Sequence, residues 1–158
     1  MHGRTPPRTK VIRQVVIRVA GEQNKYPDAI WLEFDGTPFP AQNWQDSVEG
    51  VPIGWLSEGL SALLQTGHGV LNFMWDVPEV HLNRKGKSPY VDVQLKPYRW
   101  APQTTGDRFR VELTQLAHAI LKIAKECIRL LDAMEHTEIA FRSAYMKAKQ
   151  EWLNSKMP

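Results

Sequence analysis

The sequence predicts an α+β fold, in which an antiparallel sheet of about five to seven strands is covered by helices. Segments with strand-like alternation come first, one helical segment interrupts them, and helical segments end the chain. This order differs from the regular alternation of strands and helices that builds a parallel doubly wound sheet. We therefore expect one helix between the strands and C-terminal helices packed on the sheet.

The expected strands are rich in β-branched and aromatic residues, and many of them alternate between apolar and polar positions. The clearest alternation places Ile30, Leu32 and Phe34 on one face of a strand. Strands are expected at residues 11–20, 29–34, 70–75, 77–82, 90–95 and 108–113, with a further short one within 39–48.

Three segments carry the spacing of a helix. Residues 52–66 have proline in the first turn and end before Gly67, which favours the left-handed conformation that stops a helix. Residues 114–135 carry an apolar stripe, and Thr114 is the expected N-cap. Residues 138–153 are helical as well, and the pattern leaves open whether 114–153 is one helix or two.

Length and composition indicate one domain. The chain has 158 residues, and we assign residues 11–158 to a single α+β domain and residues 1–10 to a flexible basic tail. No apolar run approaches the roughly 20 residues that cross a bilayer, so we expect no membrane partner. The single cysteine, Cys127, allows no disulfide within the chain, which fits a reducing, cytoplasmic location.

Motifs for catalysis are missing. The five histidines have no metal-ligand spacing, and His118 and Cys127 would face opposite sides of one helix, with Cys127 in the core. Neighbouring carboxylates such as Glu33 and Asp35 leave a glycosidase-like pair open, although sequence spacing does not place them in space. We therefore predict a protein that is not an enzyme and has no catalytic residue, cofactor or metal.

Charge is unevenly distributed along the chain. Residues 26–83 contain eight acidic residues and no lysine or arginine, whereas the remainder carries all 20 basic residues. Two interpretations are open: the two parts neutralise each other within the fold, or the acidic part forms an exposed surface for a basic partner. Complementary charge mainly raises association rates and fixes register.

We predict that a protein partner binds the acidic centre. Turns near Asp35 and Asp46 should be exposed, because glycine and prolines interrupt regular pairing there. Trp44 is a possible anchor, although at least two of the tryptophans in this part should be buried in the core. The candidate contact residues are Glu33, Asp35, Trp44, Asp46, Glu49, Asp76 and Glu79.

The alternative function is nucleic-acid binding through residues 84–100. This region holds Arg84, Lys85 and Lys87 on one turn, with Arg99 and Trp100 nearby. A basic patch beside an aromatic side chain is typical of single-strand binding. No zinc-finger, RRM or KH motif accompanies it.

Residues 29–95 resemble bacterial immunity proteins of polymorphic-toxin and contact-dependent growth inhibition systems. The resemblance is carried by WLEFDG, then Phe39-Pro40 and Trp44-Gln45-Asp46, a helix reading GWLSEGLSALL, and FMWD. It implies a non-enzymatic bacterial protein that acts as a toxin inhibitor by binding a cognate toxin domain. It transfers no functional residue to this chain.

Overall fold

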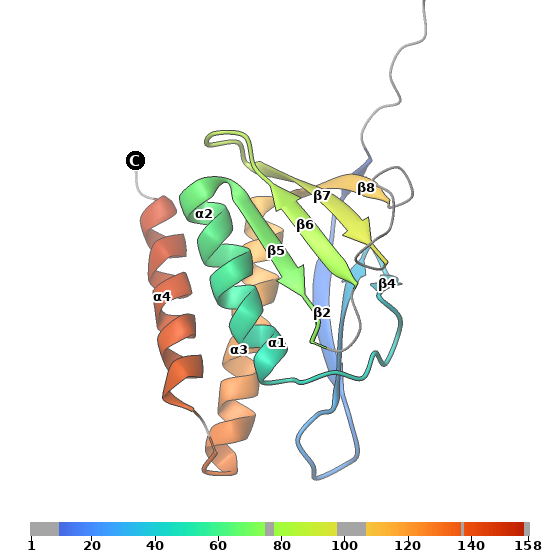
Figure 1. Ribbon diagram of the computed structural model, residues 1–158, viewed down its shortest axis with the longest axis vertical. Coiled ribbons are helices and arrows are strands. Elements are labelled where there is room, and N and C mark those ends of the chain that lie inside the picture. Colours follow the sequence, from blue (N-terminus) through green and yellow to red (C-terminus); the bar gives the residue numbers. More distant parts are fainter. Residues whose placement is uncertain (1–9, 75–77, 98–106, 137, 157–158) are drawn as a thin grey trace, which may run out of the picture.

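The computed structural model describes residues 10–74, 78–97, 107–136 and 138–156, which form an α+β fold with helices packed on β-sheets (Figure 1). The strands are β1 (Val11–Ile12), β2 (Val15–Ala20), β3 (Ala29–Phe34), β4 (Thr37–Phe39), β5 (His68–Asn72), β6 (Glu79–Asn83), β7 (Tyr90–Lys96) and β8 (Arg108–Glu112). The helices are α1 (Gly50–Gly54), the π-helical η1 (Trp55–Ser61), α2 (Ala62–Thr66), α3 (Leu113–Ala133) and α4 (Ile139–Ser155). The predicted fold class is confirmed.

The strands are divided between two sheets. One has the order β1-β8-β7-β6-β5 and the other β2-β3-β4. All described pairs are antiparallel except β1 with β8, which is parallel. The sequence predicted one sheet because it treated residues 11–20 as one strand. The Asp35 carboxylate accepts the backbone N–H groups of Arg13 (3.0 Å) and Gln14 (2.8 Å), and the chain passes from one sheet to the other at this point.

The first helical segment is longer than predicted. It begins at Gly50, passes through a π-helical middle and ends at Thr66. Gly54 and Gly59 lie in this helix, and glycine weakens the preference for the regular α conformation. Gly67 has φ of 84°, so the predicted glycine stop is confirmed.

The C-terminal part forms two helices. α3 begins at Leu113 with Glu112 at the N-cap position, so the assignment of Thr114 as N-cap was wrong. The Leu113 N–H donates to the Pro89 carbonyl oxygen at 2.8 Å, so the first N–H of the helix has an acceptor, and the N-cap lies two residues earlier than predicted. α3 packs against β2 and β8, and α4 packs against α3 and η1.

The segment after β3 is too irregular to form the short strand that was predicted within residues 39–48. β4 ends at Phe39, and the remaining contact with β3 is an isolated bridge between Ala29 and Gln45. Pro38 and Pro40 have no backbone N–H to donate to a ladder, which accounts for the short strand. The predicted tail at residues 1–10 lies outside the described residues except for Lys10.

One hydrophobic core joins both sheets and the helices. The rings of Phe34 on β3 and Phe109 on β8 lie 4.8 Å apart and connect the sheets. Phe73, which follows β5, contacts Phe39 at 6.4 Å and Trp55 at 5.3 Å. These aromatic contacts connect the helix and the strand β4 to the same ring.

The predictions for individual core residues are confirmed. Trp31 and Trp55 are both buried. Cys127 is fully buried on α3, and burial raises the pKa of its thiol to about 11. His118 is exposed on the other side of α3, where its ring lies 6.0 Å from that of Trp152. Cys127 is thus a core residue that stays protonated at neutral pH.

Candidate protein interface

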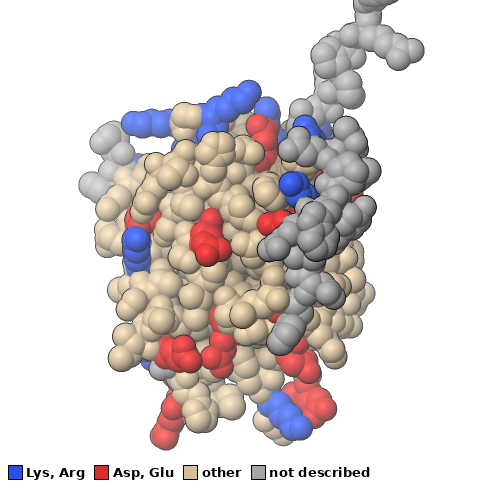
Figure 2. Space-filling model, in the orientation of Figure 1, with Lys and Arg blue, Asp and Glu red and all other residues tan. Residues whose placement is uncertain are grey.

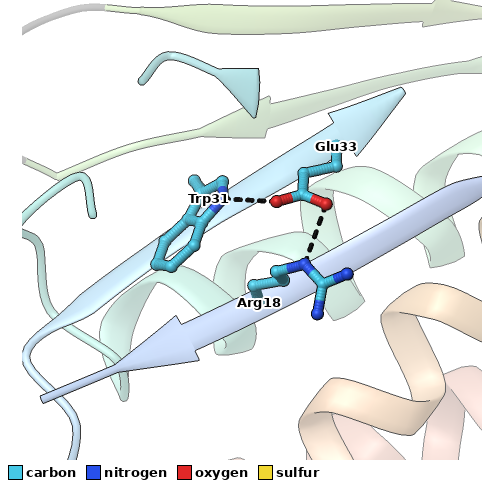
Figure 3. A network of polar contacts seen from close by, with 3 residues as sticks. All are labelled: Arg18, Trp31 and Glu33. Carbon is cyan, nitrogen blue, oxygen red and sulfur yellow. Dashed lines mark hydrogen bonds and ion pairs between the residues drawn. The ribbon is translucent and has the colours of Figure 1, made fainter. Parts of the chain in front are cut away.

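Glu33 lies in a network between β2 and β3 (Figure 3). Arg18 Nε donates to one carboxylate oxygen at 2.8 Å, and Trp31 Nε1 donates to the other at 3.1 Å. The hydrogen bond from Arg18, more than any other contact, holds the pKa of Glu33 below its ordinary value. Glu33 is therefore already paired and has limited capacity for a partner's cation.

Asp35 occupies the exposed turn between β3 and β4 with φ of 49°. Its carboxylate Oδ1 accepts the two N–H groups of Arg13 and Gln14. The predicted exposure of this turn is confirmed. The same hydrogen bonds give Asp35 a structural role at the point where β1 ends and β2 begins.

The turn before Asp46 is exposed at residues 41–43 and 45, as predicted, but Asp46 itself is buried, with 6% of its surface exposed. Its carboxylate accepts the backbone N–H groups of Ser47 at 2.7 Å and Met74 at 3.2 Å. Trp44 Nε1 donates to the same carboxylate at 3.3 Å, and the Trp44 ring packs on Phe73 at 6.3 Å. The N–H groups of Ser47 and Met74 come from segments far apart in the chain. Both need an acceptor inside the protein, and the Asp46 carboxylate is that acceptor.

Glu79 lies on β6, on the face of the five-stranded sheet away from the core. It is 3.7 Å from Nε2 of His81, and its register partner on β7 is Lys96. Partial burial and Lys96 lower the pKa of His81, with Glu79 opposing them. Asp76, the neighbouring predicted contact residue, lies outside the described residues.

The described candidate residues therefore belong to three separate places. Glu33 is on β3 and Asp35 is in the turn that follows it. Trp44, Asp46 and Glu49 are in the segment that leads into α1, and Glu79 is on the other sheet. Sequence proximity suggested one acidic surface, but the strands separate these residues. The structure does not bring them together as a single contact patch.

Acidic residues nevertheless collect at one end of the molecule. The loop between β2 and β3 and the connection between α3 and α4 both lie at the lower end in Figure 1. Figure 2 shows several red side chains at this end with a blue one beside them, further red ones across the face, and blue ones along the upper edge; in the loop after β2, Lys25 pairs with Glu22. We call this lower region the acidic end; its residues are Glu22, Asp28, Glu49, Asp132, Glu135 and Glu138.

Tyr26 fixes the loops of the acidic end. Its hydroxyl donates to the Val48 carbonyl oxygen at 2.9 Å, which ties the loop after β2 to the segment before α1. Burial, together with Cys127 on α3 and Glu49, raises the pKa of the Tyr26 phenol far above its ordinary value. Through this hydrogen bond, Tyr26 holds together the loop that carries Asp28 and the segment that carries Glu49.

The acidic segment is neutralised only in part by the basic remainder of the chain. The ion pair of Arg18 with Glu33 joins the two. For Asp28, Asp35, Glu49 and Glu58, no ion pair with any described residue is formed. Within the described residues, Glu33 is thus neutralised in the fold and the other four carboxylates are not, while a basic partner for them stays a prediction.

The sequence missed Glu135 and Glu138 as members of the acidic end. They lie in the part of the chain that carries the basic excess, so a count along the sequence assigns them to the opposite charge class. The signal in the sequence was a break in the helical pattern near His136-Thr137. Such a break indicates a connection between two helices, and residues beside it lie at the helix ends. The structure places that connection at the same end as Asp28.

The basic alternative region lies at the opposite end. Lys85 and Lys87 are exposed on the turn between β6 and β7, and Arg84 Nε donates to the Ser88 carbonyl oxygen at 2.7 Å. A groove of about 350 Å³ beside it crosses the outer face of β7 and β8. Arg110 lines this groove, and its guanidinium lies 5.8 Å from the ring centre of the exposed Tyr90. Arg99 and Trp100 lie outside the described residues.

Within the described ranges, no three His, Cys, Asp or Glu side chains are placed to hold a metal ion. None of the described helices has the length and apolar character needed to cross a bilayer. No protein-family model matches the chain, and searches of curated proteins and of solved structures give no significant match.

Proposed function

We propose that this chain is a non-enzymatic protein-binding module whose acidic end receives a basic surface of its partner. The observation that supports this is the collection of carboxylates at one end of the molecule, several of them without an ion pair to described residues. Such a field attracts a basic partner and orients it during encounter. Tyr26 holds two of the loops involved, so part of the surface is preorganised.

Within this class, an immunity protein that inhibits a cognate bacterial toxin domain in the cytoplasm is the specific candidate. The resemblance over residues 29–95 supports it, and so does the sign of the charge. A toxin domain that acts on an anionic substrate needs a basic cleft, and an acidic end can cover such a cleft. Inhibition then needs no chemistry from this chain.

The test uses the C-terminal domain encoded by the gene immediately upstream of this chain's gene. The domain is expressed alone and with this chain, and colony formation is counted. We expect growth arrest by the domain alone, rescue by this chain, and a stoichiometric complex on size-exclusion chromatography. Arrest that this chain does not relieve, with no complex formed, would contradict the immunity function.

Charge reversal tests the acidic end itself. Asp28→Lys with Glu49→Lys should lower the association rate constant for the toxin domain by about tenfold at low salt, because steering depends on charge. The dissociation rate constant should change less. Asp107→Lys, at an exposed acidic position just before β8, makes the same charge change as Asp28→Lys alone; it is the control for that single variant and should leave both rates unchanged. Equal effects of the two changes would show that the acidic end is not the contact.

Nucleic-acid binding is the second candidate, supported by the groove beside Lys85, Arg110 and Tyr90. It predicts that a labelled single-stranded oligonucleotide binds at about 50 mM salt and dissociates as salt rises, because phosphate contacts release counterions. Lys85→Ala with Lys87→Ala should weaken that binding. Fluorescence anisotropy without any signal at low salt removes this candidate.

A further inference from the structure

Strand β2 leaves one row of backbone hydrogen-bonding groups open. It is the outer strand of the β2-β3-β4 sheet. The Gln14 carbonyl oxygen accepts the Asp35 N–H, and the antiparallel register then turns Val16 and Arg18 toward β3. The N–H and C=O groups of the alternate residues point away from β3, and no described residue bonds to them; these residues are Val15, Ile17 and Val19.

Helix α3 forms the second wall of a groove along this edge. The groove has a volume of about 410 Å³, within the roughly 300 to 1,000 Å³ of ordinary ligand pockets. Its apolar lining comes from Val15 and Ile17 on the strand and from Ala119 and Ile123 on the helix. An extended segment in this groove would find hydrogen-bonding groups on one side and an apolar wall on the other.

The rim of the groove is basic. Lys122, Lys125 and Arg129 line it from α3. The acidic residue beside them, Glu126, already accepts hydrogen bonds from Arg129, with Nε at 3.1 Å. Lys122 and Lys125 are exposed and form no ion pair with a described residue. The rim therefore favours a segment with carboxylates.

The basic surface continues past this groove. Lys125 and Arg129 also line a neighbouring hollow of about 340 Å³ between α3 and α4. Its wall also includes Arg142, which is paired with Asp132, and Met146, which is 61% exposed, so Lys125 is the cation there that forms no ion pair with a described residue. A segment longer than β2 can thus extend from the strand edge over the helices and stay beside basic and apolar side chains.

We propose that the β2 edge and α3 bind an extended acidic peptide segment by strand addition. The segment's backbone pairs with Val15, Ile17 and Val19. Its apolar side chains contact the wall formed by α3, and its carboxylates pair with Lys122 and Lys125. This site uses β2 and the middle of α3 and has the opposite charge from the acidic end, which takes only Asp132 from the last turn of α3, so it stands independently of the proposed function.

The probe is a labelled, end-blocked peptide of about eight residues that alternates valine and glutamate, long enough to cover β2. Binding is measured by fluorescence polarisation at about 50 mM salt, where charges are weakly screened. We expect saturable binding that weakens as salt rises. A peptide with lysine in place of glutamate should bind at least about tenfold more weakly.

Amide hydrogen exchange identifies the strand edge. In the free protein, the amides of Val16 and Arg18 should exchange slowly, while those of Val15, Ile17 and Val19 exchange rapidly. The acidic peptide should slow the second set. Protection that appears elsewhere, or that appears with protein concentration alone because a second copy occupies the edge, would overturn the proposal.

Charge reversal on α3 completes the test. Lys122→Glu with Lys125→Glu should weaken peptide binding by about tenfold or more and leave the melting temperature unchanged, since both side chains are exposed. Lys85→Glu with Lys87→Glu makes the same charge change at the far hairpin and should leave peptide affinity unchanged. Equal weakening by both pairs, or no binding of the acidic peptide to the unmodified chain, refutes the proposed site.

Discussion

β5 and β2 are the two longest strands at the edges of the sheets. They differ in whether their outward backbone groups are hydrogen-bonded. At β5 the helix closes the edge: Trp55 Nε1 donates to the Asn72 carbonyl oxygen at 2.7 Å, and Thr66 Oγ1 accepts the His68 N–H at 3.2 Å. At β2 no described side chain or backbone group bonds the outward groups. An open edge is a template for pairing with another chain.

The difference depends on how near a helix can approach the strand. Gly59 on η1 and Gly69 on β5 lie against each other, and a β-carbon on Gly69 would collide with the Gly59 carbonyl oxygen. α3 instead faces β2 with longer side chains such as Lys122 and Ile123. Glycine pairs bring backbones together, whereas larger side chains hold them apart and leave a groove.

Among the substitutions that test this difference, Gly69→Ala should change the stability most, because the added β-carbon forces the helix away from β5. We expect the free energy of unfolding to fall by about 3 kcal/mol, the scale of overpacking in a core. Chemical denaturation measures it. Gly54→Ala is the control, since a β-carbon there meets nothing within 4 Å, and it should stabilise the helix by about 0.8 kcal/mol. Equal stability of Gly69→Ala and the unmodified chain would contradict the close contact.

Trp55→Phe should destabilise the protein by about 2 kcal/mol, because a buried carbonyl oxygen loses its donor. The cost should appear in chemical denaturation. The Asn72 end of β5 should also open more readily in amide exchange. If exchange changes equally along β2 and β5, the effect is general and the indole does not act on the edge.

Thr66→Val removes only the hydroxyl, at nearly constant volume. We expect a loss of about 1 kcal/mol, the scale of one hydrogen bond. The His68 amide, now without its acceptor, should exchange faster in the native protein. An unchanged exchange rate at His68 would mean that Thr66 does not close this edge.

Glu33→Gln should have the smallest effect, about 0.5 kcal/mol, because Arg18 is largely exposed. The pKa of Glu33 is lowered by folding, so its contribution is present above its ordinary pKa and is lost as pH falls through the lowered one. Melting temperatures of the two proteins should therefore converge in acid. A constant difference at all pH values would contradict this ion pair.

Much of the fold was predictable from local pattern. β7 and β8 alternate clearly, and Gly67 ends its helix because positive φ suits glycine. The division of residues 11–20 between two sheets was not predictable, because it depends on the Asp35 carboxylate, which lies more than twenty residues away. The N-cap at Glu112 likewise follows from a hydrogen bond to Pro89.

The candidate site was less predictable than the fold. The sequence showed that charge is segregated, but it could not show that Asp46 is buried or that Glu33 is paired. It also could not show that Glu135 and Glu138 join Asp28 at one end. Side-chain neighbours are set by the path of the whole chain, and sequence distance does not report them.

The α+β class, the helix after the early strands, the core position of Cys127 and the charge asymmetry could all be predicted from the sequence. Each depends on residue type and on spacing within a single element. Which carboxylates lie near one another, and which sheet edge stays open, became clear only from the folded chain. Both depend on contacts between different elements: the Gly59–Gly69 contact lets the helix approach β5, where Trp55 and Thr66 bond its edge, and the side chains of α3 leave a groove beside β2.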